Sequence, residues 1–194
     1  MMIFFKIYGT VRNVFLAMLL FSASLLSSCI RHSSQAGINS AHYFSLNKYF
    51  KNEAAILSRL NPGLVKTISV SGKLQTKRPG SINWIDEFSL FTASDINKPA
   101  WIGKYRVDSN ASQVTYMALD SDLKVRRIEI NKNRFSALHP VSSVKIKIGV
   151  QNFLYTLNEE LDYYTDSLYI ISRRQHINLL GSKYYKITGK IKHQ

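Results

Sequence analysis

The chain has 194 residues, a single cysteine, and 26 basic against 12 acidic side chains. One cysteine excludes an intrachain disulfide or a metal site made of several thiolates, and this length suits one domain. The net charge of +14 would indicate nucleic acid binding in a cytosolic protein, although lysines scattered over the surface give the same total.

The chain starts with the order of residues that is typical of a secretory signal. Lys6 and Arg12 precede the apolar run 14–21, and small residues follow it. Residues 26–29, Leu-Ser-Ser-Cys, resemble the lipobox of bacterial lipoproteins, which implies cleavage before Cys29 and acylation of its sulfur. An ordinary signal peptide or an uncleaved anchor helix remains an alternative, but serines interrupt the apolar run well short of the roughly 20 residues that span a bilayer.

Cleavage before Cys29 would leave 166 residues with a net charge of +12. We expect residues 29–41, rich in Ser, Gln, Gly and Asn, to form a flexible tether and residues 42–194 to form one β-rich domain. In the lipoprotein sorting systems that are known, an Asp directly after the acylated Cys favours retention in the inner membrane. This chain has Ile30 at that position. The resemblance therefore implies an anchor in the outer membrane, with the domain facing the periplasm.

Two helices are expected near the start of this domain. Apolar residues at helical spacing predict a helix over 45–60, followed by the stop Asn61-Pro62-Gly63. A second helix is predicted from Trp84 to before Asn97, because Lys98 precedes Pro99 and is biased away from helix.

Alternation of apolar and polar residues predicts strands almost everywhere else. The first is expected to place Leu64, Ile68, Val70 and Leu74 on one face, and another is expected to begin at Trp101. A bulge, or a strand that passes from one core to another, is predicted within 123–130, and a hairpin tip at 131–133. The sum is an α+β fold: a mainly antiparallel, curved or open sheet of about seven strands, with two helices packed on one face.

No pattern in the sequence predicts a catalytic motif, a cofactor or a metal site, since the five histidines never pair at metal-ligand spacing. Basic residues on three predicted strands would form one patch for phosphate-bearing lipid if the strands are neighbours, and otherwise only solvated edges. These residues are Lys124, Arg126, Arg127, Lys145, Lys147, Arg173 and Arg174. A second candidate is a polar-aromatic site for sugar or peptide, made of Asp162, Tyr163, Tyr164 and Asp166.

Five segments carry a resemblance to a family of uncharacterised lipoproteins from Bacteroidota: Phe44 to Lys73, Asp95 to Trp101, Tyr116 to Asp120, Asp162 to Leu168 and Leu179 to Gly189. This resemblance implies no activity. We expect a non-enzymatic binding or assembly module, tethered to the membrane, whose partners are anionic lipid, glycan or an envelope protein and not nucleic acid. Two alternatives stay open. The first is an acyl-chain or lipoprotein carrier or receptor with an apolar cavity, because the expected architecture resembles in outline the lipoprotein carrier and receptor proteins of the periplasm. The second is a glycan-acting hydrolase using Asp162 or Asp166.

Overall fold

The computed structural model describes residues 43–136 and 139–193, which belong to one compact unit, Ala41–Gln194. The predicted signal segment, the predicted acylation site Cys29 and the predicted tether 29–41 lie outside the described residues.

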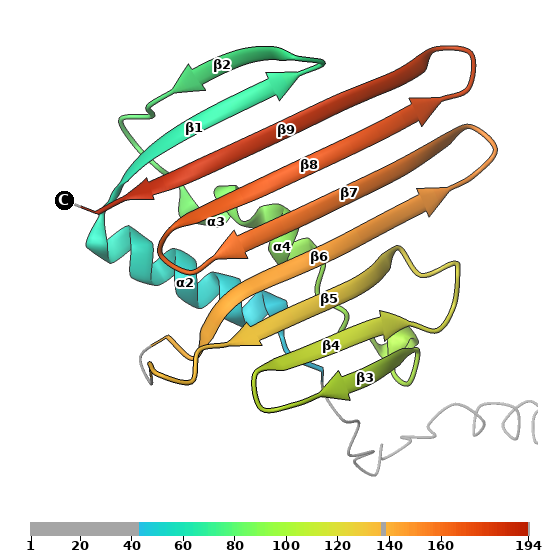
Figure 1. Ribbon diagram of the computed structural model, residues 1–194, viewed down its shortest axis with the longest axis horizontal. Coiled ribbons are helices and arrows are strands. Elements are labelled where there is room, and N and C mark those ends of the chain that lie inside the picture. The colour runs from blue at the N-terminus through green and yellow to red at the C-terminus, as the bar shows by residue number, and fades with distance from the viewer. Residues whose placement is uncertain (1–42, 137–138, 194) are drawn as a thin grey trace, which may run out of the picture. The chain divides into compact units, whose positions relative to one another are not determined.

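One antiparallel sheet organises this unit, and it has nine strands where the sequence predicted about seven. The sheet is open, and its strand order is β2-β1-β9-β8-β7-β6-β5-β4-β3 (Figure 1). From β3 to β9 each strand pairs with the next in the chain, while the N-terminal hairpin adds to the last strand through β1. The strands are β1 Gly63–Val70, β2 Lys73–Lys77, β3 Tyr105–Ser109, β4 Gln113–Ala118, β5 Val125–Lys132, β6 Val141–Gln151, β7 Tyr155–Tyr164, β8 Leu168–Ile177 and β9 Gly181–Lys192.

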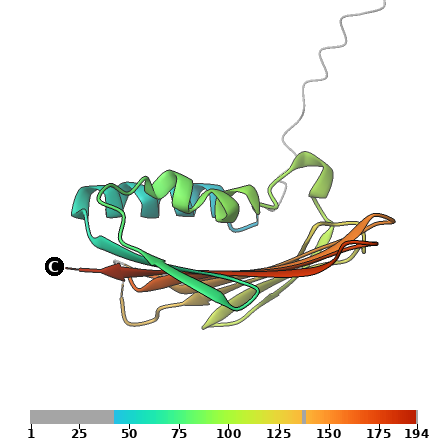
Figure 2. The same cartoon turned by 90° about the horizontal axis from the view of Figure 1, so that it is seen from above.

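All described helices lie on one face of the sheet, which confirms the α+β, open-sheet prediction (Figure 2). Helix α2, Leu46–Leu60, begins at the N-cap Ser45, whose side chain accepts a hydrogen bond from the Lys48 amide, and ends at Asn61 in the left-handed conformation. The second predicted helix is interrupted at Phe88 and becomes α3, Trp84–Glu87, and α4, Ser89–Ala93. A short 3-10 helix, η2 Pro99–Trp101, follows.

The single strand predicted to run from Leu64 to Leu74 is instead the hairpin β1–β2. Ser71 and Gly72 both have positive φ, of 47° and 91°, so the chain reverses between them. The reversal moves Leu74 opposite Ser69, away from the helices, and leaves it 74% exposed. The prediction that Leu74 shares a face with Ile68 was therefore wrong.

Two other boundaries differ from the sequence prediction, and one irregularity is confirmed. Trp101 ends η2 because Pro99 starts a helical turn, so β3 begins only at Tyr105. Residues 131–133 are not the hairpin tip, since Asn131 still pairs with Ser143 on β6. The expected bulge in β5 is present between Val125 and Arg127, and it lets both Val125 and Ile128 point toward the helices.

The core lies between the helices and the facing side of the sheet and is filled by aromatic rings. Phe50 of α2 lies 4.7 Å from Phe91 of α4 and 5.2 Å from Tyr163 of β7, measured between ring centroids. Phe88 contacts Tyr169 of β8 in an edge-on arrangement. In the part of the chain that the structure describes, no helix is long and apolar enough to cross a membrane.

Candidate functional site

The face of the sheet opposite the helices is not covered by any other described element (Figure 2). Because side chains alternate along a strand, this outer face receives every second residue of each strand. Most of these side chains are polar or charged, as on β7, where Thr156, Asn158, Glu160 and Asp162 point outward.

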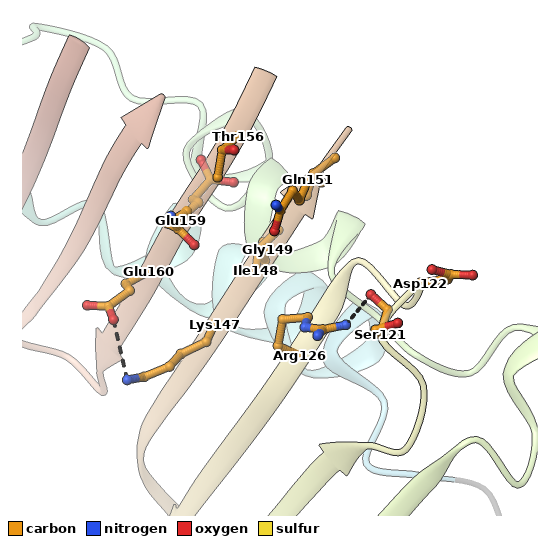
Figure 3. A pocket seen from close by; sticks show the side chains of 12 residues that line it. Ser121, Asp122, Arg126, Lys147, Ile148, Gly149, Gln151, Thr156, Glu159 and Glu160 are labelled. Atoms are coloured by element: carbon orange, nitrogen blue, oxygen red, sulfur yellow. Dashed lines mark hydrogen bonds and ion pairs between the residues drawn. The ribbon is translucent and has the colours of Figure 1, made fainter. Parts of the chain in front are cut away.

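A depression of about 510 Å³ lies on this outer face over β6 and β7 (Figure 3). Gly149 forms part of its floor, and a Cβ atom there would approach the Arg126 side chain to 3.3 Å. Ser121, Asp122 and Glu159 belong to its polar lining, and so do two cations, another acid, two amides and another hydroxyl. These last groups belong to Arg126, Lys147, Glu160, Gln151, Asn158 and Thr156.

Arg126 forms one wall of this depression and is held in place by the turn before β5. Its Nη1 donates to the backbone carbonyls of Asp120 and Leu123, each at 3.1 Å, and to that of Ser121. The β5 bulge gives Arg126 this position, since the extra residue is left without a partner on β6. The bulge predicted from the sequence therefore shapes the site.

A second depression, of about 350 Å³, adjoins the first and shares Asn158 and Glu160 with it. It adds Ser172 and Arg174 from β8 and Tyr184 from β9. We call the two depressions together the outer groove. It crosses the strands from the β5 bulge to Tyr184, whose ring is 39% exposed.

The cations of the predicted basic patch do not gather into one unpaired cluster. Arg127 pairs with Glu129 at 2.5 Å, and Lys147 pairs with Glu160 at 3.4 Å. Lys145 lies between Glu129 and Asp162 in the strand register.

Three further cations of the patch occupy three different settings. Lys124 is exposed in the loop before β5, and Arg174 lines the outer groove. Arg173 lies on the helix-facing side, where its Nη2 is 2.7 Å from the carboxylate of Glu159, which is 3% exposed. The patch is therefore divided between two faces and is largely charge-compensated on the outer one.

A third depression, of about 290 Å³, lies on the helix-facing side next to Leu90 of α4. Ile171, Ile187 and Tyr185 line it together with the Glu159–Arg173 ion pair. It is open to one side and is smaller than most ligand pockets, which measure roughly 300–1,000 Å³. The aromatic core fills the space deeper between the helices and the sheet.

The polar-aromatic cluster of β7 is also divided by strand alternation. Asp162 and Tyr164 point outward, where burial raises the pKa of Asp162 and Lys145 partly counteracts that rise. Tyr163 points into the core and Asp166 lies in the turn after β7, where its carboxylate is 3.2 Å from His139. None of the three depressions is lined by Asp162 or Asp166.

Two buried acids were not predicted from the sequence: Glu159, which pairs with Arg173, and Glu53. Glu53 of α2 is 5% exposed and accepts a hydrogen bond of 2.6 Å from the Tyr163 hydroxyl. Burial raises its pKa and the charge of Asp166 adds to the rise, while the Tyr163 hydroxyl and His139 oppose it. Its place on α2, three residues after Phe50 and four before Leu57, is a core position by helical spacing, and that was the available signal.

No group of three or more potential metal ligands occurs among the described residues. No protein-family model, curated protein or solved structure matches this chain. The outer groove is the largest depression described and combines amide, hydroxyl, carboxylate and guanidinium groups with one aromatic ring. Such a set can hydrogen-bond a ligand rich in hydroxyl groups and stack against a sugar ring.

Proposed function

We propose that this chain is a lipoprotein of the bacterial envelope, tethered through acylated Cys29 to the outer membrane, whose domain binds a glycan in the outer groove without catalysing a reaction. The lipobox resemblance supports the tether. The observation that carries the binding role is the continuity of the groove, because Asn158 and Glu160 line both of its depressions.

The charge in the groove favours a glycan over a phosphate-bearing ligand. Lys147 is paired with Glu160, and Arg126 is already bonded to three carbonyls. An anionic ligand would have to compete with Glu160 for Lys147 and with the carbonyls for Nη1 of Arg126, and would find Arg174 at the far end. Hydroxyl groups can bond to the donors and acceptors of Gln151, Thr156 and Asn158. Tyr184 at one end offers a ring face for stacking.

The tether is tested by Cys29→Ser and cell fractionation. We expect the wild-type chain in the outer-membrane fraction with an acylated N-terminal cysteine by mass spectrometry, and loss of membrane retention in the variant after a high-salt wash, which leaves an acyl anchor in place. A wild-type chain without acyl groups would contradict the tether, and it would leave the groove proposal to be judged by its own experiment.

Binding is tested by co-sedimentation of the detergent-purified full chain with peptidoglycan sacculi and, separately, by titration with lipopolysaccharide-derived polysaccharide. Tyr184→Ala combined with Asn158→Ala should lower binding about tenfold or more, since each removes a stacking or hydrogen-bonding contact worth about 1 kcal/mol. Leu74→Ala, on the same face but outside the groove, is the matched control. Equal binding by the double variant and the control would contradict the glycan role.

A carrier of acyl chains is the second candidate, and the third depression beside Leu90 is the observation that favours it. Substituting Ile187→Glu, in its wall, should abolish binding of a fluorescent fatty acid if this candidate is correct. The hydrolase alternative receives no comparable support, because neither Asp162 nor Asp166 lines a depression.

A further inference from the structure

Two neighbouring hairpins expose four large apolar side chains at one end of the sheet. The β6–β7 tip carries Phe153 and Leu154, which are 89% and 66% exposed, and the β8–β9 tip carries Leu179 and Leu180, which are 105% and 78% exposed. We call these four residues the twin tip. Single exposed apolar residues are ordinary, but a contiguous group of this size marks an interaction site.

Hydrogen bonds hold the two tips against each other. The Asn178 amide donates to the carbonyl of Leu154 at 3.1 Å, and its side-chain Nδ2 donates to the carbonyl of Phe153 at 2.6 Å. Within the first tip, Asn152 Oδ1 accepts from the amides of Leu154 and Tyr155, each at 2.9 Å. The backbones of the two tips are therefore held together, and the four apolar side chains extend from adjoining turns.

Leu179 occupies a backbone conformation that is unfavourable for a leucine. Its φ is +72°, in the left-handed region that glycine and asparagine occupy readily and that costs a leucine roughly 1 kcal/mol or more. The side chain gains no packing in return, since it is fully exposed. A strained, exposed leucine at the end of a hairpin is consistent with a partner that covers it.

The charges around the twin tip indicate what that partner is. Residues 148–158 contain no charged side chain, and residues 173–186 contain four cations and no acid. Arg174 and Lys183 lie on opposite faces of the β8–β9 hairpin, a few residues behind its end. Apolar residues in front of cations are the arrangement that binds an anionic membrane surface, with the apolar group buried about 5–10 Å and the cations at the headgroups.

We propose that the twin tip inserts into the headgroup region of an anionic lipid bilayer. Leu179 and Phe153 enter the boundary with the acyl chains, Arg174 and Lys183 meet lipid phosphates, and Tyr184 and Tyr185 lie near the interface, where aromatic rings are favoured. This contact is separate from the acyl anchor and does not require Cys29 to be modified. It would fix the orientation of the domain on the membrane.

The test uses the purified full chain with Leu179→Cys labelled with NBD and reconstituted by detergent removal into vesicles of phosphatidylethanolamine and phosphatidylglycerol. We expect NBD emission to shift to shorter wavelength and to be quenched by doxyl-labelled lipid. Leu154→Cys, on the other tip, should behave alike. Leu60→Cys, an exposed leucine at the end of α2 and at the opposite end of the sheet, is the matched control and should show neither change.

Additional measurements separate the possible outcomes. Wild-type chain treated with the same label reports any unmodified Cys29, so failure of the acyl anchor is seen independently of the tip. Vesicles of phosphatidylcholine alone, or high salt, should reduce quenching at position 179 if the cations act as described. Equal signals at positions 179 and 60, or quenching at 179 that is unaffected by lipid charge, would overturn the proposal of an anionic-membrane contact.

Discussion

Strands β6 to β9 have two ends with different surroundings. At one end the helix-facing side is buried under α2, α3 and α4, and Tyr163 and Tyr169 are fully buried among phenylalanine rings. At the other end the same strands extend beyond the helices as two hairpins (Figure 1). These hairpins carry the exposed apolar side chains of the twin tip. Apolar residues at the covered end contribute to stability, whereas those at the twin tip are available for binding.

The largest effect is expected from Gly189→Ala at the covered end. A Cβ atom on Gly189 would lie 2.2 Å from the ring of Tyr169, which packs across the glycine and also donates a hydrogen bond to Glu87. Since Tyr169 is fully buried, it cannot move aside without disturbing this contact, and we expect a loss of about 3 kcal/mol in the free energy of unfolding. Urea denaturation measures it.

Gly63→Ala is the matched control for that substitution. Gly63 also lies in a strand paired with β9, but its nearest neighbours to an added Cβ are at 3.7 Å, which is ordinary contact. We expect no loss, and a gain of up to about 1 kcal/mol from the reduced freedom of the unfolded chain. Similar losses for both variants would show that the Tyr169 ring is not the reason.

The Gly189 case shows where sequence reasoning about the fold ends. Helical spacing predicted α2 to within a residue, because the buried stripe and the cap both lie in one segment. Nothing local indicates that Gly189 faces Tyr169, since that contact depends on the register of β8 against β9. The Ser71–Gly72 reversal is a different case, because the dipeptide is a local turn signal that the alternation of apolar residues across it outweighed.

Only some residues of the outer groove could be predicted from the sequence. Arg126, Lys147 and Arg174 were named from their charge, but the amide of Asn158 and the ring of Tyr184 were not, because only strand order brings them together. The residues of the polar-aromatic cluster lie on two faces for a simpler reason. Consecutive residues of a strand point to opposite faces, so Tyr163 and its neighbours cannot line one pocket.

The second prediction concerns the buried hydrogen bond at the covered end. Tyr163→Phe removes the hydroxyl that donates a hydrogen bond to Glu53, and it leaves the buried carboxyl group of Glu53 without that partner. We expect a loss of about 2 kcal/mol by urea denaturation. Combining it with Glu53→Met, which removes both polar partners, should recover most of the loss. A double variant as unstable as the single one would mean that the bond is not the cause.

A smaller, pH-dependent effect is expected for Glu53→Gln. The folded state holds the Glu53 proton more tightly than the unfolded chain, because burial raises its pKa above the ordinary 4.5. Wild-type stability should therefore fall as pH rises from 4.5 through the raised pKa, and this contribution is absent in the variant. The melting temperature of the wild type should therefore fall relative to that of Glu53→Gln as the pH rises across that range. The Gln side chain can still accept the hydrogen bond from the Tyr163 hydroxyl. Parallel curves would contradict the raised pKa.

The smallest effect on stability is expected at the twin tip, from Leu179→Asn. No packing is lost, because the side chain is fully exposed, and asparagine adopts the positive φ of +72° more readily than leucine. We expect the free energy of unfolding to stay within about 0.5 kcal/mol of the wild-type value or to rise slightly.

The same substitution should weaken the contact with anionic vesicles, as read from an NBD label at Leu154→Cys in the Leu179→Asn background. Membrane contact would then weaken at a residue whose replacement leaves stability unchanged or slightly higher, and this distinguishes a binding tip from a part of the core. A clear loss of stability on Leu179→Asn would show instead that Leu179 is packed against the protein. Leu179 would then contribute to stability, as the apolar residues at the covered end do, and the proposed difference between the two ends of the strands would be wrong.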